Sequence, residues 1–98
     1  MSEATAPTGP LVRDLPIINK RGLHARAAAK FVQTAERYEA IVTVLKDGHS
    51  VGGSSIMGLM MLAASPGTSV RVVASGPQAQ DVIQALTDLF ANRFGEGE

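Results

Sequence analysis

The stretch AIVTVLKDGHSV, from Ala40 to Val51, carries the strongest local indication of fold in this chain. Strand-forming residues fill Ala40–Lys46 and His49–Val51, and Asp47 and Gly48 separate the two runs. Two-residue hairpin turns need positive φ at both central positions, and an Asp-Gly pair adopts that backbone readily. The sequence therefore predicts an antiparallel hairpin.

Two more strands are expected outside the hairpin. LVRDLPII, Leu11–Ile18, is rich in strand formers, and Pro16 indicates a sheet edge or a strand end because proline cannot donate to the ladder. In TSVRVVAS, Thr68–Ser75, apolar residues expected in the core alternate with Ser69, Arg71 and Val73, as in a half-buried strand. The core positions of this alternation are Val70, Val72 and Ala74.

Helical segments separate the strands. ARAAAKFVQTAERY, Ala25 to about Tyr38, is rich in helix formers, and SSIMGLMMLAA is expected to form a short helix capped by Ser54 or Ser55. A final amphipathic helix follows a Gly-Pro pair. The order βαββαβα predicts one α+β domain with a four-stranded antiparallel sheet and helices on one face. The helical residues expected in the core are Ala28, Phe31, Val32, Ala35, Val82, Ile83, Leu86, Leu89 and Phe90.

The composition limits the possible functions. The chain has 98 residues, of which 45% are hydrophobic, and this is enough for one core. Nine basic residues balance nine acidic ones, so no global charge points to nucleic acid or a membrane surface. The sequence has no cysteine, which excludes disulfides and thiol chemistry, and a cytoplasmic location is expected. Residues 1–10 and 95–98 are expected to be tails around a domain at 11–94, and no apolar run has the length of a membrane span.

The stretch GLHAR contains the candidate chemistry. It places His24 at the expected N-cap of the first helix, where unpaired N–H groups and partial positive charge attract an anion. Those amides belong to Ala25, Arg26 and Ala27, and the Arg26 guanidinium adds donors suited to phosphate oxygens. A neutral imidazole is a nucleophile near pH 7. The same pattern also fits an ordinary surface histidine, and spacing alone does not distinguish a functional histidine from a surface one.

Two longer motifs carry a family resemblance: NKRGLHARAAAKFV, residues 19–32, and SSIMGLMMLAASPGTSVRVVASG, residues 54–76. Over Leu11–Phe94 the chain resembles the histidine-containing phosphocarrier protein HPr of the bacterial phosphoenolpyruvate-dependent phosphotransferase system. The resemblance implies an open-faced β-sandwich. It also implies a carrier rather than an enzyme, with no cofactor and no metal.

The same resemblance implies a phosphoryl relay. Enzyme I, charged from phosphoenolpyruvate, donates to Nδ1 of His24, and Arg26 stabilises the transferred group. A IIA-type protein of a sugar-uptake or nitrogen-type regulatory branch then accepts it. Ala27 stands where many members have proline, and it restores a backbone donor that proline lacks.

Ser55 aligns with the regulatory serine of that family, which an ATP-dependent serine kinase/phosphorylase modifies in some bacterial lineages. Serine is also a preferred helix N-cap, so a purely structural role is the alternative. Ser54 stands where many members have a basic residue, which leaves the choice between the two serines open.

The short helix has more apolar residues than it can bury, so we expect part of them in the core and part in a docking patch near His24. The expected docking residues are Ile56, Met57, Met60 and Met61. Lys20, Arg21 and Lys30 bracket His24 and would steer acidic partners, unless they form only a solvated face. His49 is expected to be a surface histidine.

Two other functions stay open at the level of sequence. A regulatory module would use Ser55 to control partner binding and would leave His24 vestigial, which the intact GLHAR motif disfavours. An RNA-binding domain of this architecture would stack bases on sheet aromatics, and the predicted strands carry none. We therefore expect a monomeric carrier that binds enzyme I and IIA-type proteins, and neither nucleic acid nor membrane.

Overall fold

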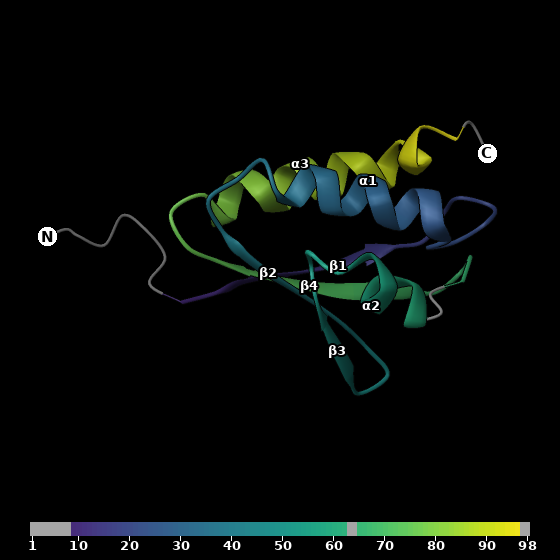
Figure 1. The fold of residues 1–98 in the computed structure, drawn as a ribbon, viewed down its shortest axis with the longest axis horizontal. Helices are drawn as coiled ribbons and strands as arrows, with labels where there is room; N and C mark the ends of the chain where they lie inside the picture. Colours follow the sequence, from purple (N-terminus) through teal and green to yellow (C-terminus); the bar gives the residue numbers. More distant parts are fainter. Residues whose placement is uncertain (1–8, 63–64, 97–98) are drawn as a thin grey trace, which may run out of the picture.

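The computed structural model describes residues 9–62 and 65–96, and it contains the predicted hairpin. Asp47 and Gly48 have φ of 52° and 80°, as a two-residue turn of this kind needs. Through this turn β2 (Ile41–Lys46) pairs antiparallel with β3 (His49–Gly52). The hairpin forms one side of the sheet (Figure 1).

Strand β4 (Ser69–Ser75) lies inside the sheet. It pairs antiparallel with β1 (Leu11–Pro16) on one side and with β2 on the other, which gives the strand order β1-β4-β2-β3. Its alternate residues Val70, Val72 and Ala74 are fully buried, so the predicted inward face is confirmed. The sheet is four-stranded and antiparallel, as the sequence predicts.

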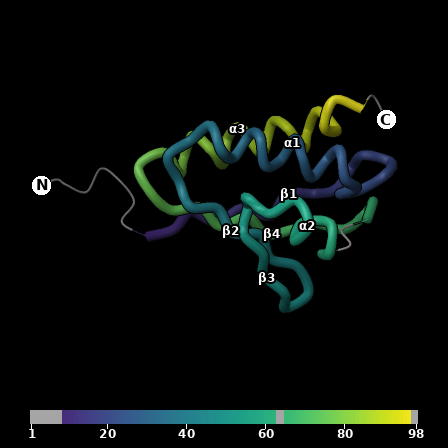
Figure 2. The backbone as a smooth tube through the Cα atoms, in the orientation of Figure 1, coloured from purple at the N-terminus to yellow at the C-terminus, as the bar shows by residue number. Residues whose placement is uncertain are grey.

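Helices α1 (Ala25–Ala35) and α3 (Ala79–Ala91) lie side by side over one face of the sheet (Figures 1 and 2). The short α2 (Ile56–Met61) packs beside α1 and β3. The helical residues predicted to face the core are buried, except Leu89, which is half-buried. The arrangement is the predicted α+β open-faced sandwich.

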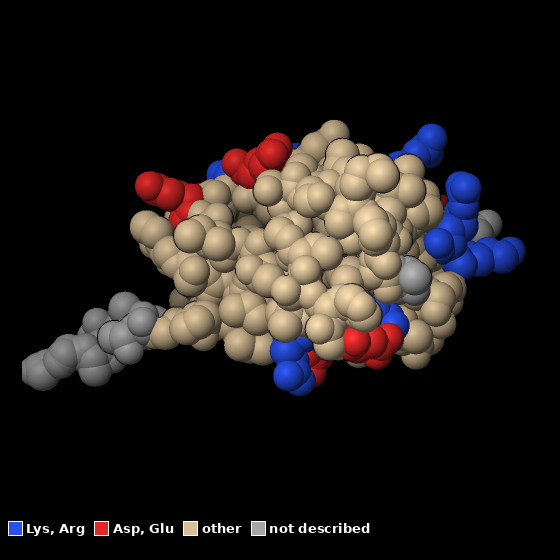
Figure 3. All heavy atoms as spheres, turned by 60° about the horizontal axis from the view of Figure 1, so that its bottom comes forward, with Lys and Arg blue, Asp and Glu red and all other residues tan. Residues whose placement is uncertain are grey.

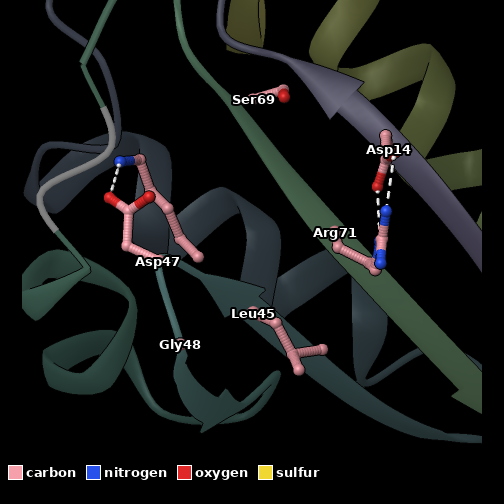
Figure 4. A pocket seen from close by; sticks show the side chains of 7 residues that line it. Asp14, Leu45, Asp47, Gly48, Ser69 and Arg71 are labelled. Atoms are coloured by element: carbon pink, nitrogen blue, oxygen red, sulfur yellow. Dashed lines mark hydrogen bonds and ion pairs between the residues drawn. The ribbon is translucent and has the colours of Figure 1, made fainter.

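The opposite face of the sheet is mixed, with exposed Val12 and Ile41 beside polar side chains. There the guanidinium of Arg71 on β4 donates to the carboxylate of Asp14 on β1, with 2.8 Å from Nε to Oδ1 and 3.3 Å from Nη2 to Oδ2 (Figure 4). The hydrogen bonds from Arg71 hold the pKa of Asp14 below its usual value. Because both side chains are exposed, water screens the pair and it adds little to stability.

Three buried phenylalanines connect α1, α3 and the C-terminal segment. The rings of Phe31 and Phe90 meet edge to face with centroids 6.1 Å apart, and those of Phe90 and Phe94 are 4.8 Å apart. Phe94 belongs to a 3₁₀ turn, Arg93–Gly95, that follows α3. Such aromatic pairs stabilise beyond their buried area, so the chain after α3 is anchored in the core.

Several predicted boundaries are wrong by a few residues. The first strand ends at Pro16 rather than Ile18, because Ile17 bonds to the loop before β4 instead: its N–H donates to Thr68 at 2.8 Å. The first helix ends at Ala35 rather than Tyr38, because the N–H of Tyr38 turns back to the Ala35 carbonyl at 3.2 Å. The predicted strands at 40–46 and 68–75 begin one residue later, and the one at 49–51 extends to Gly52.

Most of the predicted N-terminal tail lies outside the described residues, as do residues 63 and 64 of the predicted short helix. At the other end, Gly95 and Glu96 fall within the described part. None of the helices in residues 9–62 and 65–96 has the length and apolar character needed to cross a lipid bilayer.

Replacing Phe94 with alanine should lower the free energy of unfolding by about 3 kcal/mol, because a buried ring is lost and a cavity remains. Chemical denaturation monitored by circular dichroism measures this loss. The control is Ile41→Ala, at a side chain that is 72% exposed, which should change stability by no more than about 0.5 kcal/mol. Equal losses in the two variants would show that Phe94 does not anchor the C-terminal segment.

Candidate functional site

His24 is the N-cap of α1. Its backbone is extended, with φ −76° and ψ −179°, and its carbonyl accepts the first helical hydrogen bond from Ala28 at 2.8 Å. Gly22 has φ +66°, a left-handed backbone that suits glycine and turns the chain sharply into the helix. The imidazole makes no capping hydrogen bond, so the ring is available for other contacts.

The first backbone amides of α1 form the potential anion site that the sequence predicts. Within residues 9–62 and 65–96, no acceptor is bonded to the N–H groups of Ala25, Arg26 and Ala27. Ala25 and Arg26 are exposed, whereas Ala27 is fully buried. An anion at the surface therefore meets the first two amides together with the partial positive charge of the helix end.

A cleft of about 290 Å³ opens beside the His24 ring. It is lined by Arg21, His24, Arg26, Lys30, Gly95 and Glu96. The lining thus combines three cationic side chains with one carboxylate. In the space-filling view, several Lys and Arg side chains gather at the right-hand end of the molecule, where β1 leads into α1 (Figures 1 and 3). The cleft suits a small anion such as a phosphoryl group.

Glu96 reaches the site from the C-terminal segment. Its Oε2 contacts Nε2 of His24, and its Oε1 accepts a hydrogen bond from Nδ2 of Asn19 at 3.0 Å. Burial acts to raise the pKa of Glu96, but hydrogen bonds from Asn19 and His24, with the charges of His24 and Arg21, bring that pKa below its usual value. The carboxylate is therefore ionised at neutral pH.

The sequence analysis did not single out Asn19 or Glu96. Asn19 lies inside the first family motif, and its complete burial is unusual for a polar side chain, but burial is not visible in the sequence. Glu96 lies 72 residues beyond His24, in a segment interpreted as a tail. No local pattern connects the two.

The predicted basic residues divide between two settings. Arg21, Arg26 and Lys30 line the cleft, whereas Lys20 is an exposed side chain that is not part of the lining. The ammonium of Lys30 also donates to the carbonyl of Phe94 at 2.7 Å. Lys30 therefore ties α1 to the C-terminal segment in addition to adding positive charge.

The N-cap of α2 is Ser55, which decides which of the two serines caps the short helix. Its Oγ accepts a hydrogen bond from the N–H of Gly58 at 3.0 Å. The Ser55 residue is exposed, as is Ser54.

The apolar residues of the α2 region divide between core and surface. Leu59 is fully buried and Leu62 nearly so. The exposed apolar residues, which form what we call the α2 patch, are Ile56, Met57, Met60 and Met61. Exposed apolar groups of this kind commonly mark binding surfaces.

His49 stands apart from this site. It is exposed on the hairpin, and its Nδ1 lies 3.1 Å from the carbonyl oxygen of Asp47. The hollow beside it has no arginine in its lining, whereas Arg21 and Arg26 line the cleft at His24.

Comparisons with known proteins agree with this fold. The family model described as "PTS HPr component phosphorylation site" matches residues 11–92. The phosphocarrier protein HPr of Cupriavidus necator is 51% identical over 88 residues, covering 90% of this chain and 99% of that protein. The crystal structure of HPr-C-His from Thermoanaerobacter tengcongensis has a TM-score of 0.84 at 44% identity, covering 88% of this chain and 97% of that chain. An HPr dimer structure from the same organism has a TM-score of 0.71 at 43% identity, covering 98% and 100%.

The fold is an α+β open-faced sandwich, and a cleft lined by three cationic side chains lies beside the histidine that caps α1. The chain belongs to the PTS-HPr family, and its role is that of a phosphocarrier of the phosphotransferase system.

Proposed function

We propose that His24 is the residue that carries the phosphoryl group. Nδ1 of His24 accepts the group from phosphorylated enzyme I and passes it to a IIA-type protein, in a sugar-uptake or nitrogen-type regulatory branch. The observation that carries this proposal is the position of the imidazole, at the N-terminus of α1 and in a cleft lined by three cationic side chains. An imidazole is a competent nucleophile near neutral pH and can form such a covalent intermediate.

Arg26 and the first amides of α1 have a distinct role in this proposal. The phosphoryl oxygens carry negative charge throughout the transfer, so the guanidinium of Arg26 and the amides of the exposed residues Ala25 and Arg26 stabilise them. The buried N–H of Ala27 contributes mainly through the helix dipole.

The α2 patch is the proposed docking surface for both partners. A relay protein must bind enzyme I and the IIA-type acceptor in turn, so it needs a reusable surface and fast exchange. Methionine adapts to different partners, and the patch carries three exposed methionines. Lys20, Arg21 and Lys30 add a positive field that speeds encounter with acidic partners. In this proposal the working unit is a cytoplasmic monomer, in which the patch stays free.

Ser55 is the proposed control point. Its exposed hydroxyl precedes the α2 patch, and a phosphate there would add about −1.5 to −2 charges beside the docking surface. An ATP-dependent serine kinase/phosphorylase is the proposed modifying partner. Anions are tolerated at helix N-termini, so the modification would act on docking rather than on folding.

The first test of the proposal is phosphorylation by enzyme I and phosphoenolpyruvate. The chain should gain one acid-labile phosphoryl group, which His24→Ala should abolish and His49→Ala should preserve. The His24 side chain makes no capping hydrogen bond, so His24→Ala should remain folded. Intact-protein mass spectrometry measures the label, and labelling that persists in folded His24→Ala would contradict the proposal.

Arg26→Ala should slow single-turnover transfer by at least ~10-fold, since this requires only ~1.4 kcal/mol of differential stabilisation. Arg26→Lys should recover part of the rate, because a point charge replaces the planar fork of donors. The matched control is Arg37→Ala, which removes an equal charge from an exposed residue just beyond the other end of α1. Equal rates for Arg26→Ala and Arg37→Ala would show that Arg26 takes no part in transfer.

Ser55→Asp should slow transfer from enzyme I, because the added charge lies in the docking surface. Thermal stability should stay unchanged, because an anion is tolerated at a helix N-terminus. Ser55→Ala should transfer normally and lose about 1 kcal/mol of stability, since the cap of α2 is removed. Ser54→Ala is the matched control and should change neither quantity. Transfer rates and melting curves decide the outcome: early melting of Ser55→Asp with a normal transfer rate would leave Ser55 only a structural role.

A further inference from the structure

We propose that Glu96 and Asn19 are positioning residues that keep the imidazole proton of His24 on Nε2 and thereby present the lone pair of Nδ1 to the phosphoryl donor. This inference rests on the proposed role of His24 as the phosphoryl acceptor. It assigns to the C-terminal segment a part in the transfer reaction.

The contacts of Asn19 hold Glu96 in place. Nδ2 of Asn19 donates one hydrogen to the carbonyl of Gly22 at 2.8 Å and the other to Oε1 of Glu96 at 3.0 Å. Both partners are acceptors, so the amide group must present its nitrogen to them. The Asn19 side chain is completely buried, which fixes its orientation by packing. One residue therefore links the turn before His24 to the carboxylate that contacts the ring.

The contact between Oε2 of Glu96 and Nε2 of His24 selects the tautomer. An ionised carboxylate accepts hydrogen bonds and cannot donate one, and the lowered pKa of Glu96 keeps it ionised at neutral pH. Nε2 must then be the donor. A neutral imidazole carries a single N–H, so Nδ1 holds the free lone pair. Carboxylates orient catalytic and metal-binding histidines by the same logic.

The proton stays on Nε2 throughout the transfer. The lone pair of Nδ1 forms the new N–P bond while the bond from phosphorus to the donor atom of phosphorylated enzyme I breaks, and the electron pair of that bond returns to the donor atom. The His24 ring then carries a positive charge, which faces the negative carboxylate of Glu96. Transfer to the acceptor reverses these changes at His24, so neither step needs a base to remove a proton.

The backbone of the C-terminal segment is shaped to deliver Glu96 to the ring. Arg93, Phe94 and Gly95 have φ of 52°, 55° and 76°, so three successive residues take left-handed conformations that turn the chain back toward α1. Such conformations are unfavourable for residues other than glycine. Burial of the Phe94 ring and the hydrogen bond from Lys30 to the Phe94 carbonyl offset that cost. The position of the carboxylate is thus built into the fold.

The experiment measures the ring proton and the transfer rate separately. In ¹⁵N-labelled, unphosphorylated protein, the Nε2–H of His24 should exchange slowly with water. Glu96→Ala should accelerate that exchange and slow transfer from enzyme I, each by at least ~10-fold, the factor expected from loss of a hydrogen bond to a charged group. Glu96→Gln keeps an oxygen acceptor without the charge, so it should retain slow exchange and recover only part of the rate.

Two controls separate positioning from general effects. Glu36→Gln removes the same charge from an exposed side chain at the other end of α1 and should match the parent in both measurements. Asn19→Ala should slow transfer in the parent but not further in Glu96→Ala, because the two residues act through one contact. Melting curves establish that each variant is folded under the conditions used.

Each outcome bears on the inference. Unchanged Nε2–H exchange in Glu96→Ala would overturn it, and so would an unchanged transfer rate. Faster transfer in Glu96→Ala would also overturn it and would make Glu96 a cover over His24. Because the exchange measurement needs no enzyme I, failure of the parent to accept a phosphoryl group would count against the proposed function alone.

Discussion

The packing of Phe94 against Phe90 is the interaction on which the site depends. α1 and α3 already meet through Phe31 and Phe90, and they would cover the sheet without the last turn. With Phe94 buried, the residues after α3 must fold back over the N-terminus of α1. A hydrophobic contact in the core thus determines where a charged side chain stands at the surface, and the polar chemistry around His24 follows from apolar burial.

The site balances its charges instead of accumulating positive ones. The three cationic side chains and the helix N-terminus favour an incoming anion, while the carboxylate of Glu96 occupies part of the cleft before that anion arrives. A carrier must release the group as well as bind it. In the proposed phosphorylated state, the cations would face the phosphoryl oxygens and the carboxylate would face the opposite side of the ring. This arrangement would stabilise that state without another positive charge.

Most of the elements and positions that could be predicted from the sequence are set by interactions between neighbouring residues. The Asp47–Gly48 turn, the alternation along β4 and the N-cap position of His24 depend on a few neighbouring residues, and all three are present in the structure. The ends of elements were less predictable. The backbone groups of Ile17 and Tyr38 bond to neighbouring loops and turns, and those partners depend on the tertiary fold.

The sequence by itself determined the order of elements, the inward faces of the helices and the identity of the candidate histidine with its arginine, because these properties follow from residue periodicity and short motifs. The tertiary structure alone decided that Ser55 caps α2. It also brought Asn19 and Glu96 together at the His24 ring. Glu96 lies more than 70 positions from both residues that it contacts. Core packing and a left-handed backbone turn bring it there, and the residues in contact carry no sequence pattern that predicts either feature.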